Sequence, residues 1–499
     1  MLKKCFLLIL ILFLNRQPTS AITGYEQTIK EGIFLNYYDL VQLSKTRFPQ
    51  GDLLQKLSKQ LTTPIIQQPP LDQAEFLHSS SLRDFIRVTS WNIERGFNVD
   101  LIEKIFEYNP DALTEAQKEA SILSNASILV LNEVDIGVLR TDYENIAERL
   151  ASKLKMGYVF GTEFIEVDPY QLGIKPFTKE ERVFLETKTL EKLDDIDESK
   201  YRGLHGTAIL TKYSILNAKI IRLPDCYKWY KEELQKISTL ELARRETAEK
   251  IFSAKILSEL RHGGRMALIV DLLLLNNEKI TVVATHLENR CLPKCRAIQF
   301  EHLLNNIKHI THPLILAGDL NTTGADASPV TIKKEVLKRV KDPEFIAKQA
   351  IASITPLTFT QNLILGTVNA IRQFKDPTTK NIPIILPNKE RKIFTLLQDF
   401  RFADGKTFDL RGTPGKSYKG HYAFLSNSNE RDIKGYKPTF ELDRNLGIAQ
   451  YKLDWIFVKP LDLKDSYTPH FGRTLRLANR IFGKEISDHD PITVDILVK

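Results

Sequence analysis

The sequence has 499 residues, of which 42% are hydrophobic and 26% are charged. This balance is ordinary for a globular protein and excludes a collagenous, low-complexity or largely disordered chain. The formal net charge of +8 at pH 7 fits a partner that carries phosphate, but it does not separate a nucleic acid from a lipid headgroup. A modestly basic, solvated surface explains the same charge.

The N-terminus has the pattern of an export signal. Lys3 and Lys4 precede an apolar run at 6–14, and small residues follow at 19–21. This run is too short to span a bilayer, which takes about 20 residues. We therefore expect a signal peptide at 1–21 and a protein that is exported, either periplasmic or secreted, with no later transmembrane segment. An uncleaved N-terminal anchor is the alternative.

Residues 22–84 are weakly patterned and predict an N-terminal extension that lies on the main domain. Within it, 53–61 has the apolar spacing of a short amphipathic helix. The stretch 62–70 is rich in Pro and Gln, which is typical of a linker.

From residue 85 the pattern changes to short apolar runs that end in polar residues. Near-continuous runs of this kind are typical of strands buried on both faces. Helical spacing at 142–155 and 296–308 predicts helices between some of the strands. The strand-like runs are 85–91, 127–131, 207–210, 267–271, 280–285, 313–317, 455–458 and 492–496. We therefore predict an α/β domain over 85–499, in which two sheets pack face to face with helices outside.

Three stretches of this domain have the composition of insertions, near 178–201, 229–261 and 324–452. The first two are rich in Lys and Glu at helical spacing, which predicts exposed helices with i, i+4 pairs. The third is much longer and separates two polar motifs. Its length favours a lid or a substrate platform, with passive surface decoration as the alternative.

Six short polar motifs follow or precede the predicted strands. Each alone has a plain structural explanation, because strand ends are often polar and solvated. A carboxylate that interrupts an apolar run, as Glu133 does, needs a partner such as a metal or another cation. The motifs are 90–96 (SWNIERG), 131–135 (LNEVD), 285–289 (THLEN), 316–321 (LAGDLN), 452–458 (KLDWIFV) and 486–492 (ISDHDPI).

The motifs contain the groups that phosphoester hydrolysis requires. On extended backbone Asp319 and Asn321 would face the same side. His489 stands between two carboxylates, and an Asp–His pair fixes the tautomer of the ring and raises its basicity. His286 lies at the end of a predicted strand, where a histidine is more often a core residue than a catalyst. Oxygen ligands and imidazoles without a thiolate set predict Mg²⁺, or Mn²⁺ or Ca²⁺, as the metal.

Taken together and in this order, the motifs resemble those of the endonuclease/exonuclease/phosphatase superfamily. The superfamily includes DNase I-like nucleases, apurinic endonucleases, inositol polyphosphate phosphatases and bacterial sphingomyelinases. The resemblance runs from about residue 88 to 496, with the insertions unmatched. It implies an α/β fold, a four-layer sandwich of two packed mixed β-sheets flanked by helices, with helical insertions and the site at one rim. The stretch 201–210 is similar to the family's His-Gly-Asn-Ala-Ile-Leu element, but Thr207 stands where Asn is usual and receives no predicted contact.

The resemblance also implies residue roles. Asn92 and Glu133 would hold the metal, with Asp488 nearby. His489 would be the general base or would polarise the phosphate, oriented by Asp454.

Three further residues complete the implied catalytic set. Asp319 would align the attacking water, Asn321 would donate to the phosphate, and His286 would lie by the scissile phosphate and stabilise the transition state or protonate the leaving group.

Three arginines near the motifs, Arg95, Arg140 and Arg296, are candidates for contact with the phosphate or for support of the residues that make it. For Arg140 and Arg296, an ordinary place on a helix surface is an equal alternative.

Removal of the signal would leave Cys226, Cys291 and Cys295. An odd number leaves a free thiol or an intermolecular bridge. The spacing of Cys291 and Cys295 allows a local disulfide in an oxidising compartment, with two unpaired thiols as the alternative. A zinc site is less expected, because no Cys/His set with ligand spacing accompanies them.

The leading functional prediction is an exported, metal-dependent phosphodiesterase or nuclease without an obligate protein partner. Aromatic and basic residues at 228–231 and 416–422 would suit a nucleic acid, whereas the apolar stretch 363–371 would suit a membrane. A sphingomyelinase-like or inositol-phosphate-type headgroup hydrolase is therefore the alternative. A non-catalytic binding protein with the same fold is the alternative of another class.

Overall fold

The computed structural model describes the chain in segments. They are 32–70, 85–108, 114–168, 172, 196–235, 260–274, 276–322, 389–410, 438–443, 448–460 and 471–497. The predicted signal peptide at 1–21, the stretches 363–371 and 416–422, and most of the predicted insertions at 178–201 and 324–452 lie outside these residues. Within them, no helix is long and apolar enough to cross a membrane.

The first of two mixed sheets has eight strands, and β7 pairs with β4 at one edge. β2 and β3 are parallel neighbours at its centre, and the other pairings are antiparallel. Its strands, in spatial order, are β1 (Ile65–Gln67), β4 (Gly157–Glu166), β5 (Leu204–Thr211), β3 (Ile128–Ile136), β2 (Phe85–Arg95), β15 (Ile492–Leu497) and β14 (Phe471–Thr474), with β7 (Arg261–Gly263) beside β4.

The second sheet has five strands, of which β9 and β10 are parallel. In spatial order they are β13 (Asp454–Lys459), β10 (Leu314–Asp319), β9 (Lys279–His286), β8 (Met266–Leu273) and β6 (Ser214–Arg222). A separate two-stranded sheet pairs β11 (Phe440–Asp443) with β12 (Ile448–Tyr451).

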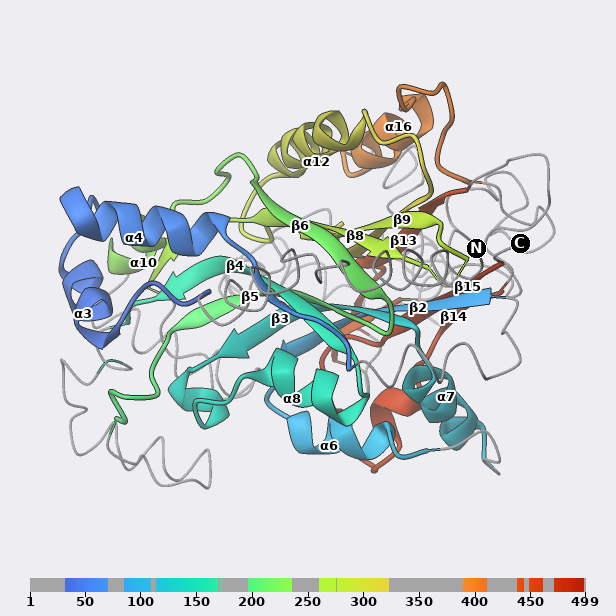
Figure 1. Ribbon diagram of the computed structural model, residues 1–499, viewed down its shortest axis with the longest axis horizontal. Coiled ribbons are helices and arrows are strands. Elements are labelled where there is room, and N and C mark those ends of the chain that lie inside the picture. Colours follow the sequence, from blue (N-terminus) through green and yellow to red (C-terminus); the bar gives the residue numbers. More distant parts are fainter. Residues whose placement is uncertain are drawn as a thin grey trace, which may run out of the picture.

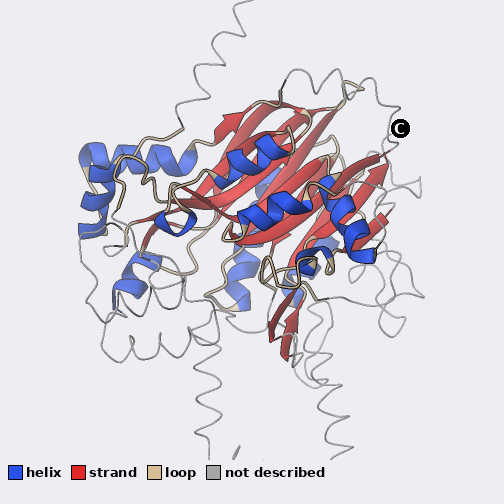
Figure 2. Cartoon of the chain, turned by 90° about the horizontal axis from the view of Figure 1, so that it is seen from below, coloured by secondary structure: helices blue, strands red, loops and turns tan. Residues whose placement is uncertain are grey.

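Alternation of side chains along each strand builds the layers. In β3, Ile128 and Val130 face the second sheet, and Leu129 and Leu131 face the helices on the other side. Both faces are buried, which explains why the run is continuously apolar. Helices cover the outer face of each sheet (Figure 1), and in Figure 2 they lie across the strands. The predicted four-layer α/β sandwich is therefore confirmed.

Helices α6 (Val99–Ile105), α7 (Glu115–Ser124) and α8 (Ile146–Lys153) supply apolar residues to the core behind the first sheet. Helices α12 (Pro293–Ile307) and α16 (Arg391–Asp399) do the same behind the second. The short 3-10 turns are Leu139–Thr141 and Ala478–Arg480.

The part of the N-terminal extension that is described joins the first sheet. Helices α3 (Tyr37–Lys45) and α4 (Gly51–Thr62) precede β1, which pairs with β4 through Ile65 and Phe160. The linker interpretation of 62–70 was wrong for the residues in β1, because their backbone pairs with β4 and Ile65 packs into the core.

The disulfide prediction was wrong in its pairing. Cys295 is bonded to Cys226, 69 positions away, and Cys291 is a free, buried thiol. Cys291 Sγ donates to the backbone oxygen of Glu288, 3.4 Å away, so this side chain points back into its own turn. Cys295 lies in the first turn of α12 and faces the segment that follows β6. Spacing alone could not show which thiol faced a distant cysteine.

Candidate active site

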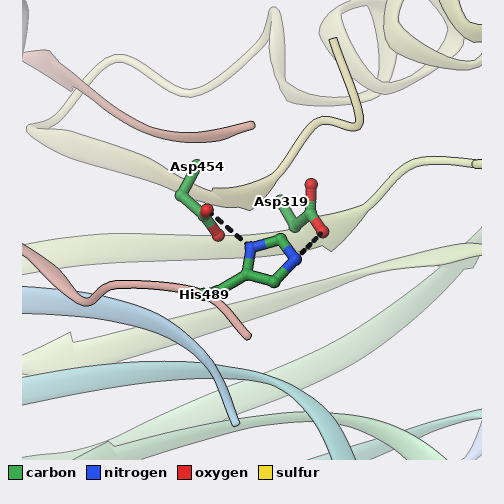
Figure 3. Close-up of side chains that lie close together, drawn as sticks. All are labelled: Asp319, Asp454 and His489. Carbon is green, nitrogen blue, oxygen red and sulfur yellow. Dashed lines mark hydrogen bonds and ion pairs between the residues drawn. The ribbon is translucent and has the colours of Figure 1, made fainter. Parts of the chain in front are cut away.

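An aspartate–histidine pair lies at one rim of the two sheets. Asp319 ends β10, Asp454 begins the antiparallel strand β13, and the two residues are directly paired. Asp454 Oδ2 lies 2.8 Å from His489 Nδ1, and Asp319 Oδ2 lies 3.8 Å from His489 Nε2. The imidazole therefore stands between two carboxylates (Figure 3). Because Nδ1 faces an acceptor, it carries a proton, and Nε2 faces the centre of the site.

Burial and charge oppose each other in this pair. Burial lowers the pKa of His489, but Asp454, Asp488 and Asp319 outweigh it and hold that pKa well above its ordinary value. Burial raises the pKa of Asp319 to about 7, and the charge of Asp454 adds to this effect. The site thus holds a carboxyl that can gain or lose a proton near neutrality, beside an imidazole that keeps its own.

Two long-range hydrogen bonds join the last motif to β2. Trp91 Nε1 donates to the backbone oxygen of His489 over 2.9 Å, and Ser487 Oγ donates to the backbone oxygen of Asn92 over 2.6 Å. Each bond links positions that are almost the whole domain apart in sequence. They fix the loop that carries His489 against the central strand.

The end of the long predicted insertion also contacts the site. Thr439 Oγ1 accepts the backbone N–H of Asp454 over 3.2 Å. The ring of Phe440 lies 5.2 Å from that of His489, and the two residues form an isolated β-bridge. This stretch therefore positions the Asp454–His489 pair and is more than surface decoration there.

Asn92 and Glu133 come from adjacent parallel strands. Asn92 Nδ2 lies 3.3 Å from Glu133 Oε1 and 3.3 Å from Asp319 Oδ2. The register of β2 against β3 shifts after Asn92, and that of β3 against β5 shifts after Leu131. These irregularities turn the polar side chains out of the strand alternation and toward the rim.

The backbone at these irregularities is strained. Glu94, Arg95 and Glu133 have φ values of 49°, 63° and 53°. A left-handed conformation at a non-glycine residue costs about 1–3 kcal/mol and concentrates at functional sites. Three such residues at one rim indicate a functional site, because the strained backbone there lowers the stability of the fold.

The carboxylates of Glu94, Glu133 and Asp488 act on one another, and all three are partly exposed. Burial, then Asp488 and Glu133, raise the pKa of Glu94 to about 8. Burial also raises the pKa of Glu133, but Arg95 and His205 outweigh it and hold that pKa below its ordinary value.

Carboxylate and amide oxygens are the donors that Mg²⁺, Mn²⁺ and Ca²⁺ favour. A divalent cation would offset the mutual repulsion that raises the Glu94 pKa. The residues present therefore fit a metal, and Asn92, Glu133, Asp488 and Glu94 are its candidate ligands. Ligand atoms of Asp319, Asp454 and His489 also lie within 4.8 Å of one another. In that group the His489 Nδ1 and an Asp454 oxygen already face each other in a hydrogen bond.

His286 closes the other side of the site. It ends β9 opposite Asp319, and its Nε2 lies 3.5 Å from Asp319 Oδ2. Its Nδ1 lies 2.8 Å from Nη1 of Arg265. Burial, and then Arg265 and His205, lower the pKa of His286 well below its ordinary value.

Asn321 lies beside Asp319 as predicted, but the backbone conformation that places it there is not the predicted one. β10 ends at Asp319, and Asn321 has a left-handed φ of 48°, so the premise of extended backbone was wrong. The pair is held instead by a bond from the Asn321 backbone N–H to Asp319 Oδ1, 2.8 Å long. Asn321 Nδ2 donates to the backbone oxygen of Leu287 through one of its two N–H groups.

Two of the three candidate arginines bind protein carboxylates. Arg140 donates to both oxygens of Asp135, at 2.7 and 3.0 Å, and lies near Glu166. Burial raises the pKa of Asp135, but Arg140 outweighs it and holds that pKa far below its ordinary value.

Arg296 is fully buried and pairs with Glu390. It also donates to the backbone oxygen of Glu288, which supports the loop after His286. Arg140 and Arg296 are therefore not ordinary residues on a helix surface. Both are engaged with protein groups rather than placed to contact a phosphate. Arg95 remains in the site, as its influence on Glu94 and Glu133 indicates.

Sequence reasoning included Glu94 in a motif without giving it a role, and it missed Glu163 and Arg265. Glu163 lies in β4, all of whose residues are buried. A carboxylate within the run 157–166 was the signal that could have identified it. Arg265 lies between β7 and β8 and had no comparable local signal.

Comparison with solved structures gives distant likenesses. The chain is similar to an endonuclease/exonuclease/phosphatase from Beutenbergia cavernae DSM 12333, with 14% identity, 83% of this chain and 72% of that chain covered, and a TM-score of 0.39. It is also similar to the human Nocturnin catalytic domain with bound sulfate, with 14% identity, 83% of this chain and 94% of that chain covered, and a TM-score of 0.37. For a humanized D. rerio TDP2 the identity is 13%, 83% of this chain and 100% of that chain are covered, and the TM-score is 0.36. No curated protein matches the sequence.

The family comparison covers most of the chain. The model of the Endonuclease/Exonuclease/phosphatase family matches residues 89–489, from the first polar motif to the last. The chain therefore belongs to the Endonuclease/Exonuclease/phosphatase family.

Proposed function

We propose that this protein is a metal-dependent hydrolase of phosphoester bonds. The observation that carries the proposal is the convergence of His489 Nε2 and His286 Nε2 on one oxygen of Asp319, at 3.8 and 3.5 Å. Two imidazoles beside a buried carboxyl suit a phosphate and an attacking water, because charge that develops on phosphoryl oxygens needs donors that are already in place.

His489, Asp319 and Asn321 each have a separate task. His489 keeps its proton because of the surrounding carboxylates and donates from Nε2 to a phosphoryl oxygen. Asp319, whose pKa lies at about 7, takes the proton of the attacking water, since a base works best with a pKa near the working pH. The second N–H of Asn321 holds another oxygen of the phosphate.

A divalent cation held by Asn92, Glu133 and Asp488, with Glu94 beside them, would neutralise charge on the phosphate. We propose Mg²⁺ as this ion, with Mn²⁺ and Ca²⁺ as alternatives, because the candidate ligands are all oxygens.

The charge of the site favours a phosphodiester as the substrate. Glu133 and Asp488 carry the negative charge that raises the pKa of Glu94. A singly charged diester meets less repulsion there than a doubly charged monoester does. Trp229 and Tyr230, which were candidates for stacking on bases, are buried at 3% and 7% exposure, so they give a nuclease no support.

We further propose that the protein is exported. The Cys226–Cys295 disulfide supports this, because such bonds persist in oxidising compartments and are rare in the cytosol.

The test is a comparison of kcat/KM for a generic phosphodiester, a generic phosphomonoester, DNA, RNA and sphingomyelin, each with Mg²⁺. We expect diesters to exceed the monoester by at least about tenfold, roughly 1.4 kcal/mol. Preference for sphingomyelin over both nucleic acids would select the headgroup alternative. A folded protein that hydrolyses none of the five would contradict the proposal and favour a binding role.

A further inference from the structure

The two histidines of the site are held by opposite kinds of partner. His489 Nδ1 faces a carboxylate oxygen of Asp454 at 2.8 Å. His286 Nδ1 faces a guanidinium nitrogen of Arg265, also at 2.8 Å. A carboxylate only accepts hydrogen bonds, whereas a guanidinium only donates them. The same ring atom must therefore carry a proton in His489 and lack one in His286.

Arg265 is itself held in place. Its Nη1 donates to Glu163 Oε2 over 2.7 Å, and its side chain is 3% exposed. The other oxygen of Glu163 accepts the hydroxyl of Thr207 over 2.6 Å, and Thr207 Oγ1 accepts Nδ2 of Asn132 over 3.0 Å. Glu163 therefore holds the guanidinium that faces the ring, and Thr207 and Asn132 hold Glu163.

We propose that Arg265 fixes His286 in the tautomer that carries its proton on Nε2, so that His286 presents an N–H to the substrate. Arg265 is a positioning residue, because it acts through the histidine. This inference rests on the proposed function only for the identity of the group that receives the hydrogen bond.

The direction of the His286 side chain supports this role. Nε2 is buried, and among the described residues it has no hydrogen-bond partner within the normal range. Its nearest carboxylate oxygen, in Asp319, is 3.5 Å away. A buried N–H without a partner is costly by about 1–3 kcal/mol, and a phosphoryl oxygen would satisfy it. His286 therefore holds and stabilises the phosphate by donating a hydrogen bond.

Removal of Arg265 would reverse this arrangement. Glu163 Oε2 already lies 3.8 Å from His286 Nδ1. Without the guanidinium, the carboxylate becomes the nearest partner of Nδ1 and draws the proton to that atom. The Arg265→Met variant should therefore move the proton to Nδ1, whereas Arg265→Lys, which keeps a donor-only cation, should leave it on Nε2.

The test is nitrogen-15 NMR of the histidine rings, which distinguishes a protonated from an unprotonated ring nitrogen. The spectra are recorded without metal or substrate, so the result does not depend on hydrolysis. His286→Gln assigns the His286 signals among the ten histidines. Arg261→Met is the matched control, because the Arg261 side chain is 2% exposed against 3% for Arg265, and both stack on the Phe164 ring, at 5.1 Å and 5.2 Å.

We expect wild type, Arg261→Met and Arg265→Lys to show an unprotonated Nδ1, and Arg265→Met to show a protonated one. A protonated Nδ1 in the wild type would overturn the proposal, and this holds even if a variant fails to fold. An unprotonated Nδ1 in folded Arg265→Met would also overturn it, since the arginine would then not determine the tautomer.

Discussion

Replacement of Asp454 by Asn is the most informative single change to the site. The carboxylate is fully buried, accepts Nδ1 of His489 at 2.8 Å, and raises the pKa of both His489 and Asp319. Asparagine keeps the shape but removes the charge. Loss of a positioned acid–base group costs about 10²–10⁴-fold in rate, which corresponds to roughly 2.7–5.4 kcal/mol of barrier. We expect kcat/KM at pH 7 to fall within this range.

The pH profile gives a second reading of the same variant. In the proposed mechanism the acid limb reports loss of the Asp319 proton, and the alkaline limb reports loss of the His489 proton. Asp454 raises both pKa values, so both limbs should move to lower pH in Asp454→Asn.

Asp404→Asn is the control for this variant. Asp404 pairs with Lys459, which lies at the opposite end of β13 from Asp454. We expect this control to lose stability and keep its activity. A rate for Asp454→Asn within threefold of wild type, with unshifted limbs, would refute the reasoning.

Three further predictions concern the metal ligands, a buried ion pair and the disulfide. Glu133→Gln should lower kcat/KM by about 10²–10³-fold and leave the far-UV circular dichroism unchanged; unchanged turnover would remove this residue from the site. Asp135→Asn should lower the free energy of unfolding by about 3–5 kcal/mol at pH 7, because it leaves Arg140, whose side chain is only 10% exposed, without its main partner. The Asp135 pKa is lowered in the folded state, so its stabilisation is lost as pH falls below roughly 4; urea unfolding at several pH values measures this, and a difference that persists at low pH counts against it. Replacement of Cys226 and Cys295 by Ser should lower the unfolding free energy by up to about 4 kcal/mol, from the loop that the bond closes, whereas Cys291→Ser should cost less; an equal cost for both would contradict the pairing.

The layers of the fold follow from apolar periodicity, which depends on local sequence. Continuous runs such as 127–131 predict strands buried on both faces, and β3 is buried on both faces. The strand β1 was missed, because three residues between Pro and Gln are too short a run to show a strand pattern, although Ile65 packs in the core. The helix at 229–235 forms, but Trp229 and Tyr230 are buried against the N-terminal helices and neighbouring aromatic rings. Its charged composition did not show this contact.

The sequence predicted those residues of the candidate site that lie at the ends of strands. Asp319, Asp454 and His286 meet because paired strands end at one rim. What escaped prediction is contact across the fold. Arg265 and Glu163 are separated by 102 positions and contact the site from different strand regions. No spacing in the sequence records such a contact.

Hydrolysis of a generic phosphodiester by the purified protein, with Mg²⁺ and then with EDTA, tests the central claim most directly, with His489→Ala as the inactive control. The account predicts turnover that requires the cation, returns when Mg²⁺ is restored, and is lost by about 10²-fold or more in His489→Ala. Equal turnover in EDTA, or turnover that survives in folded His489→Ala, would contradict it.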